Sequence, residues 1–285
     1  MFAVDRSDRG KLALTGSEAK PFLHALVTND VEGLDPGRGC YAAVLTPKGK
    51  MLGDLRILDL GDELLLDCER VALQAIFNVV HRAKLGMDVE LHKRTLQMGL
   101  ISVAGERLAG PREHDNVRAE VAGRPVVAVT TDVGTDLFCA SEDRDAVLGA
   151  FPAGDEAALE VLRVEAGRPR YGIDIDDTVI PEEAGLNERA VSFTKGCYPG
   201  QETVARLHYR GHPNRHLRGL RLSAPVASGA ELRLGEKVVG RLGSSVVSPS
   251  LGPIGLALVR REAQPGSTLA LDGATAEVVE LPFTR

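Results

Sequence analysis

The chain has 285 residues, of which 44% are hydrophobic, and its formal net charge at pH 7 is −6. This composition is typical of a folded globular protein and argues against a disordered chain or a nucleic-acid coat protein, while it leaves room for a local basic groove. No apolar run approaches the ~20 residues of a membrane helix, and the first residues lack the apolar core of a signal peptide, so we expect a cytoplasmic protein.

The first 100 residues read as mixed α and β structure. Residues 11–16 and 40–46 predict strands, and residues 51–69 predict a hairpin that turns at Leu60-Gly61-Asp62. Apolar residues at helical spacing predict one helix that begins behind Ser17 and a second helix over 69–84.

The middle of the chain returns to strands and then to helices. Between 96 and 140 the pattern is strand-like in the runs 96–105, 124–131 and 135–141, and helical patches follow at 143–151 and 155–166. Residues 170–200 show little periodicity and are rich in Gly, Pro and Asp, which is typical of a functional or disordered segment. From about residue 217, short strands separated by glycines predict a small antiparallel barrel or sandwich.

Cys197 lies in the unusual stretch KGCYPGQE, residues 195–202. The four cysteines are far apart and form no CxxC pair, so neither a disulfide framework nor a zinc knuckle is indicated. Lys195 would stabilise a thiolate, and the flanking glycines permit a tight turn against a ligand. The residues alone leave open whether Cys197 is a nucleophile, a metal ligand or a small residue that packs in a turn.

The segment 195–218 is basic, with five Lys or Arg residues against one acid. His208, His212 and His216 are spaced by four and could bind a metal on a helix, but Gly211 and Pro213 would break that helix. The segment is therefore either an anion-attracting rim or a solvated basic strand.

Two carboxylates require an explanation. Glu165 falls in the last turn of the helix predicted at 155–166, where the helix dipole disfavours negative charge. Arg163 or Arg168 could compensate it as a surface ion pair, or a ligand could supply N–H donors. Asp54 follows the TPKGK turn and is either a general base or a hydrogen-bonding residue at a strand end.

Several familiar sites are absent from the sequence. Residues 172–185 resemble a calcium loop only in part, because Val179 stands at position six and Gly185 at position twelve. The motifs GxxxxGK[ST], GxGxxG after a strand, HExxH and GxSxG do not occur, so nothing indicates ATP, NAD, zinc proteolysis or serine hydrolysis.

KGCYPGQE, followed by VAR and then RG, resembles the signature of the YgfZ-type folate-binding proteins, within the superfamily of the glycine-cleavage T-protein aminomethyltransferase. The runs FLHALVTNDVEGL, GCYAAVLTPKGK and LEVLRVEAGRPRYG, together with the glycine-rich end of the chain, are similar to that superfamily as a whole. Only the KGCYPGQE block points to the YgfZ branch.

The resemblance implies an α+β, three-lobed T-protein-like fold around a central hole that holds tetrahydrofolate or a one-carbon derivative of it. Residues 1–212 would form the folate-binding region, as two interleaved α+β subdomains, and residues 213–285 a C-terminal β-barrel. Glu165 falls where the superfamily has a carboxylate that grips the pterin, and the basic rim at 206–218 would attract the anionic glutamate tail of the folate. The candidate residues are, for catalysis, Cys197, Lys195 and Asp54, and, for folate binding, Glu165, Arg168, Tyr171, Tyr198, Gln201, Glu202 and Arg206, with no metal ligands.

The implied function is a tetrahydrofolate-binding protein that supports assembly or repair of iron–sulfur clusters in client enzymes. Folate and those clients are the expected partners, without direct nucleic-acid or membrane binding. Where the transferases have paired acids, this chain has Gly53-Asp54, so whether it catalyses a reaction stays open. The alternatives are a folate-dependent aminomethyltransferase or other one-carbon transferase, and a scaffold or metal carrier that uses Cys197 and the histidines.

Overall fold

The computed structural model describes residues 1–284, and the chain divides into two compact units. The first unit comprises Met1–Glu156 with Asn187–Gln201, and the second comprises Ala157–Leu186 with Glu202–Arg285. The predicted domain boundary between residues 212 and 213 was placed where the barrel strands begin, and it stays a prediction. None of the helices in the described part of the chain is long and apolar enough to cross a membrane.

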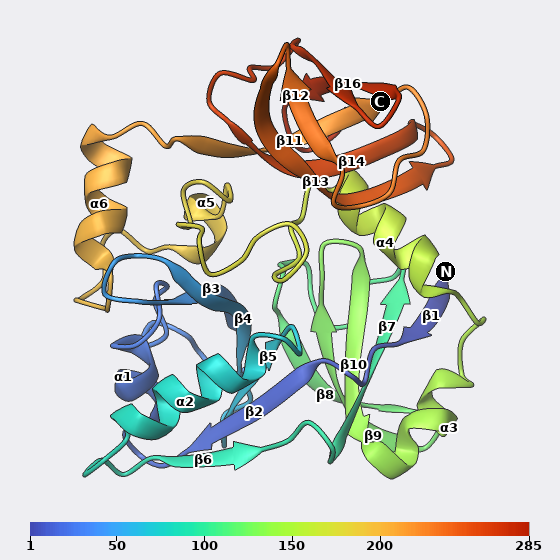
Figure 1. Ribbon diagram of the computed structural model, residues 1–285. Coiled ribbons are helices and arrows are strands. Elements are labelled where there is room, and N and C mark those ends of the chain that lie inside the picture. The colour runs from blue at the N-terminus through green and yellow to red at the C-terminus, as the bar shows by residue number, and fades with distance from the viewer. Residues whose placement is uncertain (285) are drawn as a thin grey trace. The chain divides into compact units, whose positions relative to one another are not determined.

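The first unit is built on two antiparallel five-stranded sheets (Figure 1). One sheet has the order β3-β4-β5-β2-β6, with β2 at Gly10–Thr15, β3 at Gly39–Leu45, β4 at Met51–Asp59, β5 at Leu64–Cys68 and β6 at Glu90–Lys93. The other has the order β1-β7-β10-β9-β8, with β1 at Phe2–Asp5, β7 at Met98–Ala104, β8 at Asn116–Val121, β9 at Arg124–Thr130 and β10 at Gly134–Ala140.

The hairpin predicted at 51–69 is confirmed as β4 and β5, which pair through Asp59↔Leu64. Gly61 takes a φ of +90° in the turn between them, a conformation that side chains other than glycine disfavour. The two predicted helices are also confirmed, as α1 at Ala19–His24 and α2 at Leu73–Ala83. Helix α2 contacts β2 and β4 and buries Ile76 and Val80, because its apolar residues recur on one face.

The two sheets share a hydrophobic core. Leu58 and Leu65 of the first sheet pack in one cluster with Leu100, Val129 and Phe138 of the second. The short helices η1 (Ser141–Asp143) and α3 (Arg144–Leu148) contact β7 of the second sheet. Strands β1, β6 and β8 were not predicted, because they are short or carry few buried residues.

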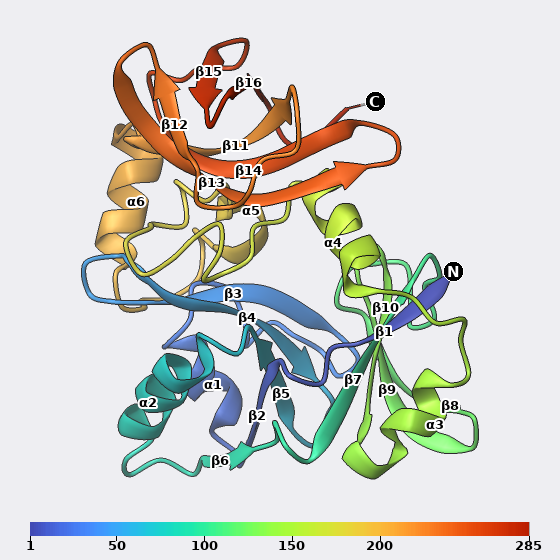
Figure 2. The same cartoon turned by 45° about the vertical axis from the view of Figure 1, so that its right-hand side comes forward.

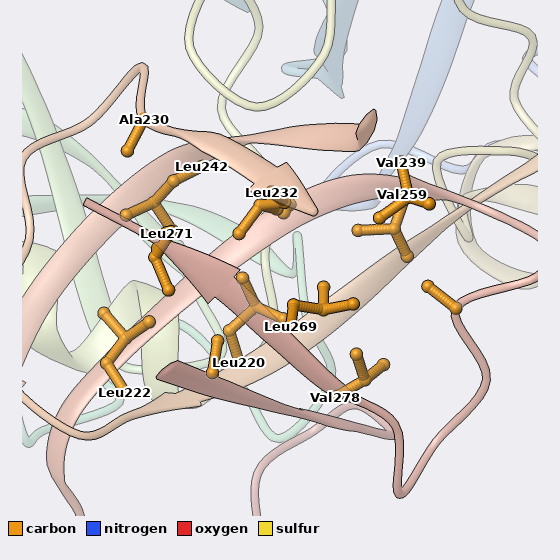
Figure 3. Packing of buried hydrophobic residues seen from close by; sticks show 13 residues of the cluster. Leu220, Leu222, Ala230, Leu232, Val239, Leu242, Val259, Leu269, Leu271 and Val278 are labelled. Carbon is orange, nitrogen blue, oxygen red and sulfur yellow. The ribbon is translucent and has the colours of Figure 1, made fainter. Parts of the chain in front are cut away.

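The second unit contains α4 (Glu156–Glu165), apart from its first residue, and a closed antiparallel barrel in the order β11-β14-β13-β12-β15-β16. Its strands are β11 at Arg215–Leu222, β12 at Glu231–Leu234, β13 at Lys237–Ser248, β14 at Gly252–Arg260, β15 at Thr268–Leu271 and β16 at Ala274–Val279. Figure 3 shows leucines and valines from these strands, together with Ala230 just before β12, packed in the barrel interior. The closed strand order confirms the predicted C-terminal barrel. Its interior is filled because alternate residues of each strand point inward.

Residues 170–200 are irregular, as predicted, apart from α5 (Asn187–Ala190). For the basic segment 195–218 a strand was one of the two alternatives, and the structure shows a strand only in its last part. Its middle part forms α6 (Gln201–Arg210), which can be followed in Figure 2, and its last residues enter β11. Gly211 and Pro213 end the helix before His212, so the three histidines do not share one helical face.

Candidate functional site

A buried carboxylate and a phenol form a pair between β3 and β4 of the first unit. In the strand register Tyr41 lies opposite Arg56 and Ala43 opposite Asp54, so Tyr41 and Asp54 project from the same face of the sheet. The Tyr41 hydroxyl donates a short hydrogen bond to Oδ2 of Asp54, whose residue is only 5% exposed. The strand pairing therefore assembles this site from two residues that are 13 positions apart.

Burial dominates the acidity of the pair. Desolvation raises the pKa of Asp54 to about 6, although the hydrogen bond from Tyr41 acts in the opposite direction. Desolvation likewise raises the pKa of Tyr41 well above its ordinary value, and the charge of Asp54 raises it further. Asp54 can thus exchange a proton near neutral pH while Tyr41 stays a hydrogen-bond donor.

A layer of polar side chains surrounds the Tyr41 ring. The Arg189 guanidinium lies 5.1 Å from the ring centroid, and the His114 ring stacks at a centroid distance of 6.5 Å. Glu113 forms an ion pair with Arg189 and lies 3.7 Å from Nε2 of His114. Burial lowers the pKa of His114 to about 4, so this imidazole is neutral beside the pair.

A second buried carboxylate in the same unit has different partners. Asp67 of β5 is fully buried, and it accepts hydrogen bonds from Arg9 at 2.9 Å and from Arg56 at 2.7 Å. Burial alone would raise the pKa of Asp67, but Arg56 and Arg9 outweigh burial and lower it. Arg56 also pairs with Asp136 of β10 at 2.7 Å and so connects the two sheets.

Lys195 is held by the end of helix α1. Its Nζ donates to the backbone carbonyl of His24 and, at 2.8 Å, to that of Val27. Burial lowers the pKa of Lys195 to about 8, and its ammonium lies 5.0 Å from the ring centroid of Tyr198. Two of the three ammonium protons are therefore committed to carbonyls, so the geometry gives Lys195 a positioning role in the loop.

The far end of the KGCYPGQE loop is held by a glycine. Gly200 has a φ of +85°, and a Cβ atom there would lie 2.6 Å from the carbonyl oxygen of Thr46. Only glycine fits this close approach to the turn between β3 and β4. Between the two anchors Tyr198 is buried, whereas the Cys197 thiol is exposed. The loop therefore presents Cys197 to solvent from a fixed backbone.

In the second unit, Glu165 is the last residue of α4 and is half-buried. Its Oε1 accepts hydrogen bonds from the hydroxyls of Ser248 and, at 3.3 Å, Ser250. Hydroxyl donors from the barrel thus compensate part of the charge at this helix end. Arg163, one of the two arginines considered for that role, instead pairs with Glu160 and Asp174.

The other predicted folate-binding residues lie between residues 168 and 206, and their roles stay predictions. Tyr171 is buried in the loop after α4, and Arg168 is half-buried there. Gln201, Glu202 and Arg206 lie on α6, where Glu202 and Arg206 are exposed. Within residues 1–284 no cluster of His, Cys, Asp and Glu could hold a metal ion.

The structure separates the predicted catalytic residues of the first unit into two groups. Among residues 1–284, no hydrogen bond or ion pair joins the Asp54–Tyr41 pair to Lys195 or Cys197. Sequence reasoning missed Tyr41, Arg189 and His114. The strand alternation of 40–46 could have placed Tyr41 beside Asp54, but no local signal marks the other two residues.

Both ends of the chain match domains of known proteins. The profile of the GCVT N-terminal domain matches residues 2–110, and the profile of the glycine cleavage T-protein C-terminal barrel domain matches residues 215–284. A putative chloroplastic transferase of Arabidopsis thaliana is 28% identical over 98% of this chain and 70% of its own length. The aminomethyltransferase of Bacillus subtilis is 27% identical over 99% of this chain and 87% of its own length.

The crystal structure of glycine cleavage system aminomethyltransferase T from Bartonella henselae superimposes with a TM-score of 0.85. The superposition covers 99% of this chain and 86% of the Bartonella chain, at 21% sequence identity. This match confirms the predicted T-protein fold, an α+β arrangement with a C-terminal antiparallel barrel. The two domain matches, the aminomethyltransferase relatives and the shared fold all support similarity to the glycine cleavage T-protein superfamily.

Proposed function

We propose that this chain is a tetrahydrofolate-dependent one-carbon transferase of the T-protein type, in which Asp54 handles a proton. The observation that carries the proposal is the buried Asp54 carboxyl, whose pKa of about 6 suits acid–base work near neutral pH. The similarity to aminomethyltransferases along the whole chain supports the same reaction class.

Tetrahydrofolate, when bound, supplies amine nitrogens that accept a one-carbon unit. The part of the chain is to bind, to orient and to move a proton. Oδ2 of Asp54 accepts the Tyr41 hydrogen bond, which leaves Oδ1 to take up or release a proton. The Arg189 guanidinium over the Tyr41 ring holds the phenol in position.

In the second unit, Glu165 has the chemistry expected of a folate-binding residue. A carboxylate accepts two parallel hydrogen bonds, which is the pattern that the amino and ring N–H groups of a pterin edge offer. The bonds from Ser248 and Ser250 both end on Oε1 and fix the side chain at the end of α4. We therefore propose Glu165 as the principal folate-binding residue of this unit.

A direct assay tests the proposed reaction. The purified protein is incubated with tetrahydrofolate and a series of aminomethyl and N-methylated amine donors, and methylene-tetrahydrofolate is quantified. We expect product with at least one donor and loss of product in Asp54→Asn. Product formation that survives Asp54→Asn would remove Asp54 from the reaction.

A folate titration tests the binding half of the proposal. Glu165→Gln should weaken tetrahydrofolate binding by about tenfold, because at least one charge-assisted hydrogen bond is lost. Glu236→Gln, at an exposed carboxylate of the same unit, is the matched control and should bind as the wild type does. Equal affinities of Glu165→Gln and wild type would exclude Glu165 from the binding site.

The exposed Cys197 thiol supports a second candidate function, the support of iron–sulfur enzymes expected of the YgfZ branch. A thiol held at the surface between two backbone anchors is accessible to another protein. In cells that carry Cys197→Ala, the activities of iron–sulfur enzymes should fall while the thermal stability of the purified variant is unchanged. Normal iron–sulfur enzyme activities in those cells would contradict this function.

A further inference from the structure

A small cavity of about 300 Å³ lies on the first unit, between helix α2 and the strands β2 and β6. It is separate in sequence from the residues of the Asp54–Tyr41 pair and from the KGCYPGQE loop. Its volume is at the lower end of the range of small-molecule sites.

Part of the cavity wall is apolar, and the remainder is formed by polar and charged side chains. Leu73 and Phe77 lie four residues apart on α2 and therefore share a face of that helix. Leu12 of β2 forms the buried floor, and Leu96, in the turn after β6, lies at the rim with 86% of its surface exposed. An exposed leucine beside an apolar cavity favours a ligand with an apolar body.

The rest of the lining contains two cations, Arg70 and Lys93, and the neutral polar residues Gln74, Thr95 and Gln97. Lys93 is paired in register with Leu12, so both side chains project toward the face that α2 covers. The Lys93 ammonium lies 4.6 Å from the ring centroid of Phe77, and Arg70 reaches the cavity from the residues before α2. Within residues 1–284, neither cation forms an ion pair, and the cavity lining contains no carboxylate.

The local charge is opposite to that of the whole chain, which is −6. We propose that this cavity binds a small amphipathic anion, a carboxylate attached to an apolar chain or ring. The apolar part packs on Leu73, Phe77 and Leu96, and the carboxylate lies between Arg70 and Lys93. The proposal does not depend on folate binding, because every residue of the cavity belongs to the first unit and lies outside the sites described above.

The probe is sodium 4-phenylbutyrate, with the neutral 4-phenylbutan-1-ol as its matched analogue. We expect saturable amide shifts of the ¹⁵N-labelled full chain at residues 73–77 and 93–97, with a dissociation constant of about 1 mM for a ligand of this size. The acid should bind several-fold more tightly than the alcohol, and added salt should reduce that difference because it screens the charges.

Charge variants then locate the site. Lys93→Met and Arg70→Met should each weaken phenylbutyrate binding about two- to fivefold, which is the size of exposed ion-pair contributions. In the double variant the acid should bind no more tightly than the alcohol. Arg82→Met, at an exposed cation of α2 outside the cavity, should leave both affinities unchanged.

Two outcomes would overturn the proposal. One is the absence of saturable shifts at residues 73–77 and 93–97, including a result in which the shifts occur elsewhere on the chain. The other is a double variant that binds the acid as tightly as the wild type does. Because both substituted side chains are exposed, the spectra of the variants should also show that the fold is intact.

Discussion

The first unit holds two buried carboxylates on neighbouring strands, and their partners give them opposite properties. Asp67 of β5 lies between Arg9 and Arg56, and these cations lower its pKa despite complete burial. Asp54 of β4 has a phenol as its hydrogen-bond partner, and burial raises its pKa to about 6. Depth is nearly the same in both cases, so the charge of the partner decides the protonation state.

The two carboxylates therefore have different roles: Asp67 stabilises the fold, and Asp54 can exchange a proton. Asp67 stays ionised and joins Arg9, just before β2, to Arg56 of the first sheet, which in turn pairs with Asp136 of the second sheet. Asp54 changes protonation in the range in which enzymes work. A buried group with a displaced pKa and a neutral partner is typical of a catalytic position.

The largest expected effect is the loss of activity in Asp54→Asn. Removal of a general acid or base costs about 100- to 10,000-fold in rate, so transferase activity should become undetectable or nearly so. The unfolding midpoint should be equal to or higher than that of the wild type, because the variant no longer buries a carboxylate. Initial rates and thermal unfolding at pH 7.5 measure both properties, and a large drop in the midpoint would contradict the comparison.

Asp67→Asn should instead destabilise the fold. The substitution leaves two buried guanidinium groups with one anionic partner fewer, which costs about 3–5 kcal/mol of unfolding free energy. Urea unfolding measures the change. Asp62→Asn is the control, because the exposed pair of Asp62 with Arg118 contributes less than about 1 kcal/mol. Equal losses of unfolding free energy in the two variants would show that Asp67 stabilises the fold no more than an exposed ion pair does.

The pH dependence of stability should distinguish the two carboxylates by sign. The folded-state pKa of Asp54 lies above its ordinary value of 3.8, so its contribution to stability is present below about pH 4 and is lost as the pH rises through 6. The wild type should therefore lose up to about 3 kcal/mol relative to Asp54→Asn between pH 4 and pH 7. The pKa of Asp67 is lowered, so its contribution is present above its ordinary pKa and is lost in acid.

Urea unfolding of wild type and Asp54→Asn at several pH values provides this measurement. A stability difference that is constant between pH 4 and pH 7 would show that the Asp54 carboxyl is not perturbed in the folded protein.

Tyr41→Phe should have the smallest of these effects. The Tyr41 hydrogen bond lowers the pKa of Asp54, so its removal should raise that pKa by about one unit and move the pH–rate profile by the same amount. A pH–rate profile of the variant checks the shift. Tyr209→Phe, at an exposed tyrosine of α6, should leave the profile where it is. An unmoved profile in Tyr41→Phe would mean that the observed limb belongs to another group.

Much of the fold could be predicted because its signals are local. Two apolar runs around Gly61 predict the β4–β5 hairpin, and short alternating runs separated by glycines predict the barrel strands. Helix α6 was missed, because it has few apolar residues and Val204 is its one buried residue. The fold could thus be recognised wherever an element buries a regular face.

The site was less predictable, because its chemistry depends on contacts between distant residues. Asp54 could be named as a candidate, but its raised pKa depends on burial and on Tyr41 across the β3–β4 register. His114 and Arg189 reach the Tyr41 ring from segments more than 70 residues apart from each other in the chain. No pattern of composition or spacing contains that information.

The two anchors of the KGCYPGQE loop have a mechanical consequence. Lys195 is bonded to the carbonyls at the end of α1, and Gly200 lies against the turn at Thr46. The four residues between these points, 196–199, cannot shift as a unit without also moving the helix or the β3–β4 hairpin. A ligand or partner that displaced the backbone at Cys197 would therefore also displace the β3–β4 turn, and with it the start of the strand that carries Asp54.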